Sequence, residues 1–283
     1  MQIVSLRQGI VFAITLATLA PAVTAFECLI EPNQVVEVRS PVEGLIEEVS
    51  MHRGDAVKEG QIVVRLDSDV EQSAVDVARY RAEMTGQVQA AKDRVEYTRK
   101  KSERLINLQG NSFVSTQHRE EAEADRRLAE SELTEAVESR ELARLEHKRA
   151  IALLARRALK SPLNGYVTER SLNPGDLAEP SAGAQSILKL VELDPLKVEV
   201  TLPMEMFGKV TGGMHVELTT EIGDLAVKAE VATVDPELDA KSGTYRVHLR
   251  LANPGNAIPA GTRCEANFPG IDGAIESTSQ RAR

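Results

Sequence analysis

The chain contains one short motif twice, and this repeat constrains the fold more than any other feature of the sequence. Residues 40–55 (SPVEGLIEEVSMHRGD) return at 161–176 (SPLNGYVTERSLNPGD) with seven of sixteen positions identical and an offset of 121. In each copy a Pro-x-x-Gly turn precedes an apolar strand and a Gly-Asp turn follows it. Because so short a β-unit cannot bury its own apolar face, we expect the two copies to pack together. The turn residues are Pro41, Gly44, Gly54, Asp55, Pro162, Gly165, Gly175 and Asp176.

The segment between the two copies is predicted to form two long helices. Residues 70–158 contain no proline and only two glycines, Gly86 and Gly110. Apolar or small residues recur at every seventh position of the first arm, as in a helix-packing seam: Val70, Val77, Met84, Ala91, Thr98 and Leu105. The complementary positions hold Ala74, Val88, Val95 and Ser102, with Arg81 as the exception.

A turn is expected at 110–114, where this seam breaks. The second arm begins near Ser115 and repeats alanine every seven residues, which suits close helix packing: Ala122, Ala129, Ala136, Ala143 and Ala150. At 1.5 Å per residue the two arms would form an antiparallel coiled-coil hairpin of about 60 Å. We therefore expect the hairpin to span 70–159 and to leave the β-unit where the two copies meet.

This arrangement resembles the periplasmic adaptor, or membrane-fusion, proteins of tripartite efflux pumps. The motif pair at 40–55 and 161–176, separated by a predicted hairpin, carries the resemblance. It implies an elongated α+β fold with a split lipoyl-like domain, whose halves would lie at 40–69 and 160–193, and a small antiparallel β-barrel domain at 194–270. A true prosthetic-group carrier is disfavoured, because Lys58 lacks the flanking Met, Asp or Ala of a modified lysine.

The resemblance also implies a function. The chain would be a non-catalytic adaptor, assembled as a hexamer, that couples an inner-membrane transporter to a TolC-like outer-membrane channel. A resistance-nodulation-division transporter is the preferred partner. The alternatives are an adaptor of an ABC-type exporter or of a type I secretion system, and a free-standing periplasmic coiled-coil scaffold.

The predicted end of the hairpin carries a docking pattern under the same resemblance. Adaptors of TolC-type channels have an arginine, a leucine four residues later and a serine seven beyond, and Arg104, Leu108 and Ser115 have this spacing. Arginine offers a planar fork of donors, leucine an apolar anchor and serine a hydrogen bond. The alternative is local: Leu108 closes the helix seam and Ser115 caps the second helix.

The β-barrel prediction rests on apolar and polar residues that alternate after Leu196, separated by Gly- and Pro-rich turns. Residues 26–39 add an N-terminal strand expected to join this barrel, and 271–283 are polar and expected to form a disordered tail. The alternating runs lie at 197–202, 216–219, 227–231, 245–251 and 264–268.

The first 25 residues resemble a secretory signal peptide. Arg7 precedes an apolar run at 10–20, and the small residues of Val23-Thr24-Ala25 suit cleavage. The run is shorter than the roughly 20 residues that span a bilayer. We expect a periplasmic protein, associated with the inner membrane through its transporter; an uncleaved N-terminal anchor is the alternative.

Two cysteines, Cys28 and Cys264, lie near opposite ends of the exported chain. A disulfide between them is plausible in an oxidising compartment and would tie the first mature strand to the last strand of the C-terminal domain. Two buried thiols that never meet are the other possibility.

Catalysis, cofactors, metals and nucleic acid are not indicated. A formal net charge of −9 disfavours nucleic-acid binding. No HExxH or CxxC spacing occurs. Met204, Met206, Met214 and His215 could suggest copper or silver handling, but core packing is the preferred interpretation. The sequence predicts a protein that is not an enzyme and has no cofactor or metal.

Overall fold

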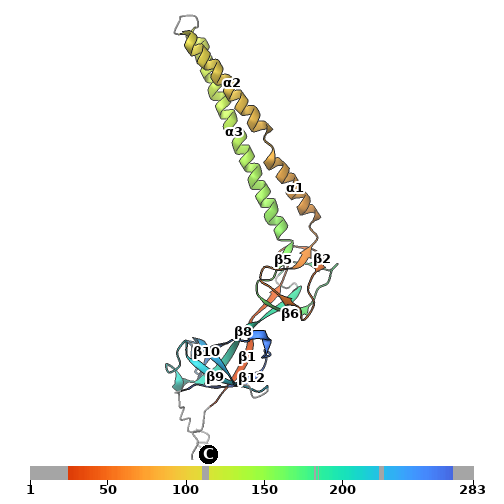
Figure 1. The fold of residues 1–283 in the computed structure, drawn as a ribbon, viewed down its shortest axis with the longest axis vertical. Helices are drawn as coiled ribbons and strands as arrows, with labels where there is room; N and C mark the ends of the chain where they lie inside the picture. Colours follow the sequence, from red (N-terminus) through yellow and green to blue (C-terminus); the bar gives the residue numbers. More distant parts are fainter. Residues whose placement is uncertain (1–24, 110–114, 182, 184, 223–225, 270–283) are drawn as a thin grey trace, which may run out of the picture. The chain divides into compact units, whose positions relative to one another are not determined.

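The computed structural model describes residues 25–109, 115–181, 183, 185–222 and 226–269 (Figure 1). It divides into two compact units, residues 34–192 and residues 1–33 with 193–283, which we call the motif unit and the barrel unit. Two strands contribute residues to both: β1 (Phe26–Val38) and β8 (Leu188–Pro203). The expected domain boundary at residue 193 therefore falls inside a single strand. The expected signal segment and tail lie outside the described residues, except for Ala25.

The two copies of the motif build the β-part of the motif unit together. Three antiparallel pairings join the stretch that holds the first copy, residues 40–66, to the stretch that holds the second, residues 158–178: β2 with β7, β3 with β6, and β4 with β5. The prediction that the copies pack against each other is confirmed. The strands are β2 (Gly44–Val49), β3 (Ala56–Val57), β4 (Ile62–Leu66), β5 (Ala158–Lys160), β6 (Gly165–Arg170) and β7 (Leu177–Ala178).

A single buried apolar cluster lies between the two copies. Ile46 comes from the first copy, and Val64 and Leu66 come from β4, which follows it; Val167 comes from the second copy and Ile187 from the segment after that. All five side chains are at most 2% exposed. Neither copy supplies enough apolar surface for such a cluster alone, so the hydrophobic driving force for each half depends on the other.

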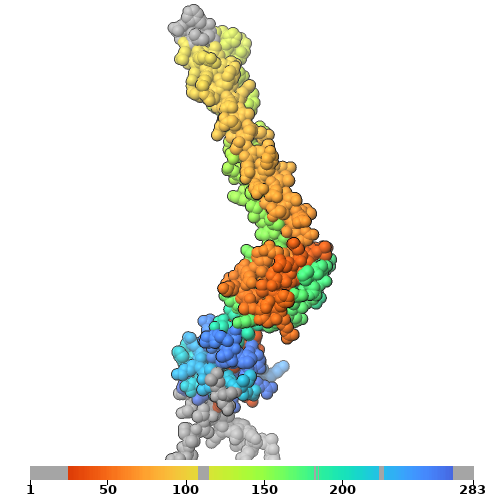
Figure 2. Space-filling view, turned by 45° about the vertical axis from the view of Figure 1, so that its right-hand side comes forward, coloured from red at the N-terminus to blue at the C-terminus, as the bar shows by residue number. Residues whose placement is uncertain are grey.

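Three helices fill the segment between the copies. Helix α3 (Thr116–Ala155) is 40 residues long, and α1 (Asp69–Glu83) and α2 (Gly86–Gln109) pack along it in turn. The first arm is two helices because the backbone leaves helical geometry at Met84, where ψ is 126°. The expected turn at 110–114 lies outside the described residues. Figure 2 shows a face where α1 and α2 (orange to yellow) lie beside α3 (green), uncovered by β-strands.

The predicted seam is confirmed on α2 and is wrong on α1. In α2 the side chains of Val88, Thr98 and Ser102 are buried as expected. In α1 the predicted column is exposed, with Val70 at 78% and Val77 at 54%, and the buried residues are those at 75 and 82. Seven-residue spacing from these two would continue at position 89, but α2 buries position 88. The break at Met84 therefore changes the phase of the seam.

The barrel unit closes a sheet on itself. Its strands run in the order β1, β12, β9, β10, β11, β8, and β1 also pairs with β8. Inward residues alternate with outward ones, which confirms the period-two prediction; on β11, for example, Val247 and Leu249 are buried. The remaining elements are β9 (His215–Thr220), β10 (Ala226–Val234), β11 (Thr244–Leu251), β12 (Arg263–Asn267) and the 3₁₀ turns η1 (Met204–Met206) and η2 (Pro254–Asn256).

The two cysteines face each other in this barrel. Cys28 on β1 is the direct antiparallel partner of Cys264 on β12, and a disulfide joins them across 236 residues of chain. The bond links the first strand of the barrel to the last, as the first alternative supposed. Both side chains are buried, so the bond lies under the barrel surface.

Candidate functional site

The end of the helical segment remote from the β-strands holds the candidate docking residues. Arg104 is exposed on α2, and its Nε donates to the carbonyl of Lys100 at 3.2 Å. Leu108 lies four residues further along α2, on the same side of the helix; its side chain is outside the described part of the structure. Ser115 is exposed and caps α3, with Oγ accepting from the backbone N–H of His118 at 3.4 Å. Ser115 therefore caps the second arm of the helical segment, as the local alternative expected.

An ion pair ties α2 to α3 near this end. Lys101 Nζ lies 2.9 Å from Asp125 Oδ2. The hydrogen bond with Asp125 raises the pKa of Lys101, and the same bond lowers the pKa of Asp125. Both side chains are well exposed, so salt screens the interaction and it stabilises the pair of helices only modestly.

Small buried side chains let α2 and α3 approach closely below this end. Thr98 and Ser102 on α2 are buried, and so are Ala122 and Ala129 on α3, each at 1% exposure. The Thr98 hydroxyl donates to the carbonyls of its own helix, Arg94 and Val95, at 3.0 and 3.1 Å. The buried Thr98 hydroxyl is thus satisfied within its own helix, and the exposed residues near the end stand on a seam of small side chains.

The two Gly-Asp turns fasten each copy of the motif to the other. The Gly54 N–H donates to the carbonyl of Val167 at 2.8 Å, and the Gly175 N–H donates to the carbonyl of Ile46 at 2.8 Å. Both glycines have positive φ, 95° and 92° respectively. This left-handed conformation favours glycine, because a Cβ there strains the backbone. The repeat of glycine at the second turn therefore has a physical cause.

The aspartates of these turns close them from within. Asp55 Oδ2 accepts from the backbone N–H of His52, and Asp176 Oδ2 accepts from that of Asn173, both at 2.7 Å. An aspartate side chain that bonds the backbone three residues earlier replaces a missing main-chain partner. Gly-Asp is thus a paired device in which the aspartate closes the turn and the glycine reaches the other copy.

The Pro-x-x-Gly turns use their glycines differently in the two copies. A side chain at Gly165 would overlap the backbone carbonyl of Val191. A side chain at Gly44 would overlap the guanidinium of Arg157 instead. Arg156 Nη2 also donates to the carbonyl of Pro41 at 2.7 Å. Pro162 opens the second turn, where the Ser161 hydroxyl donates to the carbonyl of Leu163 at 2.6 Å.

Sequence reasoning missed Arg156 and Arg157. The signal was two adjacent arginines at the end of a long helix, just before the second copy of the motif.

In the described part of the chain, no three His, Cys, Asp or Glu side chains are placed to hold a metal ion. None of the helices in that part has the length and apolar character to cross a membrane.

Comparison with known families matches both parts of this architecture. The family model of the CzcB-like, barrel-sandwich hybrid domain matches residues 34–187, and that of the CusB-like, beta-barrel domain matches residues 196–270. The first match covers more than half of the chain. A β-unit interrupted by paired helices and followed by a barrel defines an adaptor architecture, and the chain belongs to the membrane fusion proteins, the adaptor subunits of efflux systems.

Individual relatives are distant. The pyoverdine export membrane fusion protein PvdR of Pseudomonas aeruginosa is 25% identical over 197 residues, 69% of this chain and 50% of its own length. The multidrug export protein AcrE of Escherichia coli is 23% identical over 241 residues, 81% of this chain and 59% of its own. The chain thus spans about half the length of these relatives. The structure of MacA from Actinobacillus actinomycetemcomitans, with 22% identity, has the same fold at a TM-score of 0.73 over 87% of this chain and 77% of that one.

Proposed function

We propose that this chain is a periplasmic adaptor that couples an inner-membrane transporter to a TolC-like outer-membrane channel, after export by a cleaved signal peptide at residues 1–25. The proposal rests on the helical pair, by which we mean α3 and the arm formed by α1 and α2 that packs along it. The 40 residues of α3 extend about 60 Å and keep α2 alongside, up to the end that bears Arg104. A rod of this length on a β-base suits a protein that bridges two others. We infer that the pair is a coiled-coil hairpin.

The docking contact is proposed to lie at Arg104, Leu108 and Ser115. Arg104 is exposed, and among the described residues its guanidinium makes one hydrogen bond, through Nε, so most of its donors are available to a partner. The Ser115 hydroxyl accepts from the backbone N–H of His118 and also lies 3.3 Å from Nδ1 of that histidine; where the hydroxyl donates to Nδ1, one lone pair of its oxygen stays available to a partner. Capping and docking are therefore compatible functions of the same serine.

The partner at the other end is proposed to be a resistance-nodulation-division transporter, with several copies of the adaptor, six by resemblance, around the channel. The spacing of Arg104, Leu108 and Ser115 at the helix end favours this class. An ABC-type exporter or a type I secretion system is the alternative. Efflux in complemented cells separates them: an uncoupler of the proton gradient would stop a proton-driven pump directly, whereas an ATP-driven pump would continue while ATP is maintained.

Substitutions at the helix end test the docking proposal. We expect Arg104→Asp and Leu108→Ser to abolish efflux in a complementation assay while the protein stays folded and exported. Lys92→Asp, an equal change of charge at an exposed position of α2 away from the end, is the control and should leave efflux intact. Normal efflux with both end variants would remove the assignment.

A further inference from the structure

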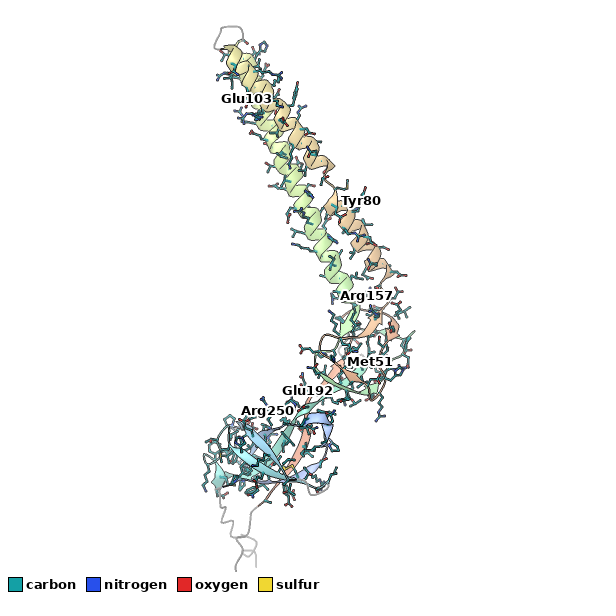
Figure 3. All side chains as sticks on the ribbon, in the orientation of Figure 1. Met51, Tyr80, Glu103, Arg157, Glu192 and Arg250 are labelled. Carbon is teal, nitrogen blue, oxygen red and sulfur yellow. A yellow bond between two sulfur atoms is a disulfide. The ribbon has the colours of Figure 1, made fainter. Side chains whose placement is uncertain are left out.

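One arginine holds three elements together where the helices meet the β-strands (Figure 3). Arg157 Nη1 donates to the carbonyl of Glu43 at 2.8 Å, and Arg157 Nη2 bonds Glu71 Oε1 on α1. The carbonyl of Arg157 accepts from the backbone N–H of Leu66, the last residue of β4, at 2.8 Å. The first turn of the motif, the start of α1 and the end of β4 thus share this one residue.

The burial and geometry of these contacts make them restrictive. The Arg157 and Glu71 side chains are each only 21% exposed, unlike the solvent-exposed pairs along the helices. A guanidinium is planar and rigid, so two of its nitrogens bonded to different elements fix the angle between those elements. Its neighbour Arg156 adds a second point of attachment at the carbonyl of Pro41, 2.7 Å away. Without these contacts, only the two short connections at 67–68 and 156–157 would join the helices to the strands, and the angle between helices and strands would vary.

The sequence repeat reveals what this contact requires. Gly44 and Gly165 are equivalent positions, 121 residues apart. At Gly165 the space of a Cβ is taken by the backbone of Val191, whereas at Gly44 it is taken by Arg157 Nη1. The second turn needs glycine for a close backbone approach, and the first needs glycine to admit one side chain.

We propose that Arg157 is a positioning residue: it fixes the direction of the helical pair on its β-base, and Gly44 provides the space that it occupies. Only the purpose of this rigidity, which is to present the helix end to a channel, rests on the proposed function. The joint itself is a property of the isolated chain. Its test therefore needs neither transporter nor channel, and the failure of one proposal leaves the other standing.

A double-mutant cycle tests the claim about Gly44. Gly44→Ala should lower the Tm of the full chain by about 3 °C or more, and should cost far less in an Arg157→Ala background, where the guanidinium is gone. Gly165→Ala is the matched control, because its neighbour is backbone: its cost should be the same in both backgrounds. An equal cost of Gly44→Ala in both backgrounds would overturn the assignment.

Spin-label distances test the claim about direction. Labels on Glu47→Cys in β2 and Ala90→Cys in α2, both exposed positions, report the orientation of the helices relative to the strands. Cys28 and Cys264 are bonded and do not react. We expect a narrow distance distribution that broadens with Arg157→Gln and stays narrow with Arg144→Gln, an exposed arginine on α3. A distribution unchanged by Arg157→Gln would contradict the proposal.

Discussion

The backbone N–H of Gly54 donates to the carbonyl of Val167, 2.8 Å away on the other copy of the motif. Gly175 and Ile46 repeat this bond with the copies exchanged, since each of these residues is 121 positions from its counterpart. The two copies therefore complete each other's hydrogen bonds as well as their shared core. This reciprocity explains how a chain can be interrupted by three helices between residues 69 and 155 and still form one β-base.

The glycine positions give a first prediction. Gly165→Ala should lower the free energy of unfolding by about 3 kcal/mol, because the new Cβ overlaps the backbone of Val191. Gly54→Ala should cost only about 1 kcal/mol, since open space surrounds it and the penalty comes from its positive φ. Gly86→Ala, with open space and no positive φ, is the control and should change little. Urea unfolding measures all three; a Gly165→Ala as mild as the control would refute the close approach.

The phase of the α1 seam gives a second prediction. Val75→Ala should destabilise the protein by about 1 to 2 kcal/mol, because this side chain is 8% exposed. Val77→Ala should cost less than about 0.5 kcal/mol, because Val77 is 54% exposed and alanine is the better helix former. Thermal unfolding followed at 222 nm compares the two, and the reverse order would restore the seam expected from the sequence.

The link between α2 and α3 should depend on pH. The pKa of Asp125 is lowered, so the folding stability that its ionised carboxylate contributes is present at neutral pH and is lost as the pH falls below about 4. The pKa of Lys101 is raised, so its contribution is lost only above about pH 10. Lys101→Met should therefore be less stable than the natural chain at pH 7 and low salt, and equal to it at pH 2. A difference that persists at pH 2 would show that the charges are not responsible.

The disulfide should carry much of the stability of the barrel unit. Replacing both cysteines, Cys28→Ser with Cys264→Ser, should lower the free energy of unfolding by about 2 to 4 kcal/mol, because the bond closes a loop of more than two hundred residues. A gel of the thiol-blocked protein, with and without reductant, checks its formation. Two free thiols on the exported protein would contradict the bond.

A fifth prediction concerns a buried phenol. Tyr245 is 2% exposed, and within the described residues its hydroxyl has no hydrogen-bond partner. Burial also raises the pKa of this phenol. Tyr245→Phe removes the unsatisfied group and keeps the ring against Phe207, 5.3 Å between centroids. We expect the variant to be as stable as the natural chain or more so by up to about 1 kcal/mol; a loss above 1 kcal/mol in urea unfolding would reveal a partner for the hydroxyl.

The β-part of the fold could be predicted from the sequence because its signals are local. Each copy of the motif identifies the other copy as its packing partner. Strict alternation of apolar and polar residues identifies a strand such as β11 (Thr244–Leu251). The choice of seam on α1 could not be predicted. Two columns of apolar residues, one through Val70 and Val77 and one through Val75 and Ala82, both have seven-residue spacing. Spacing alone does not say which column faces the partner helix.

The candidate site could be predicted only where its residues lie close together in the sequence. The spacing of Arg104 and Ser115 is visible in the sequence, and the structure places both at the surface. Arg157 was missed because its partners Glu43 and Glu71 lie 114 and 86 residues away. The adjacent arginines at 156–157 are visible in the sequence, but nothing local shows which partners the fold brings to them.

The central claim, that the end of the helical pair binds an outer-membrane channel, is tested most directly in living cells. A photo-crosslinking amino acid at Asn107, an exposed position beside Arg104 and Leu108, leaves the docking residues intact, and the same amino acid at Glu47 is the control. We predict an adduct between the adaptor and the channel from Asn107 and none from Glu47. Exported protein that supports efflux, yet gives no channel adduct from Asn107, would contradict the account.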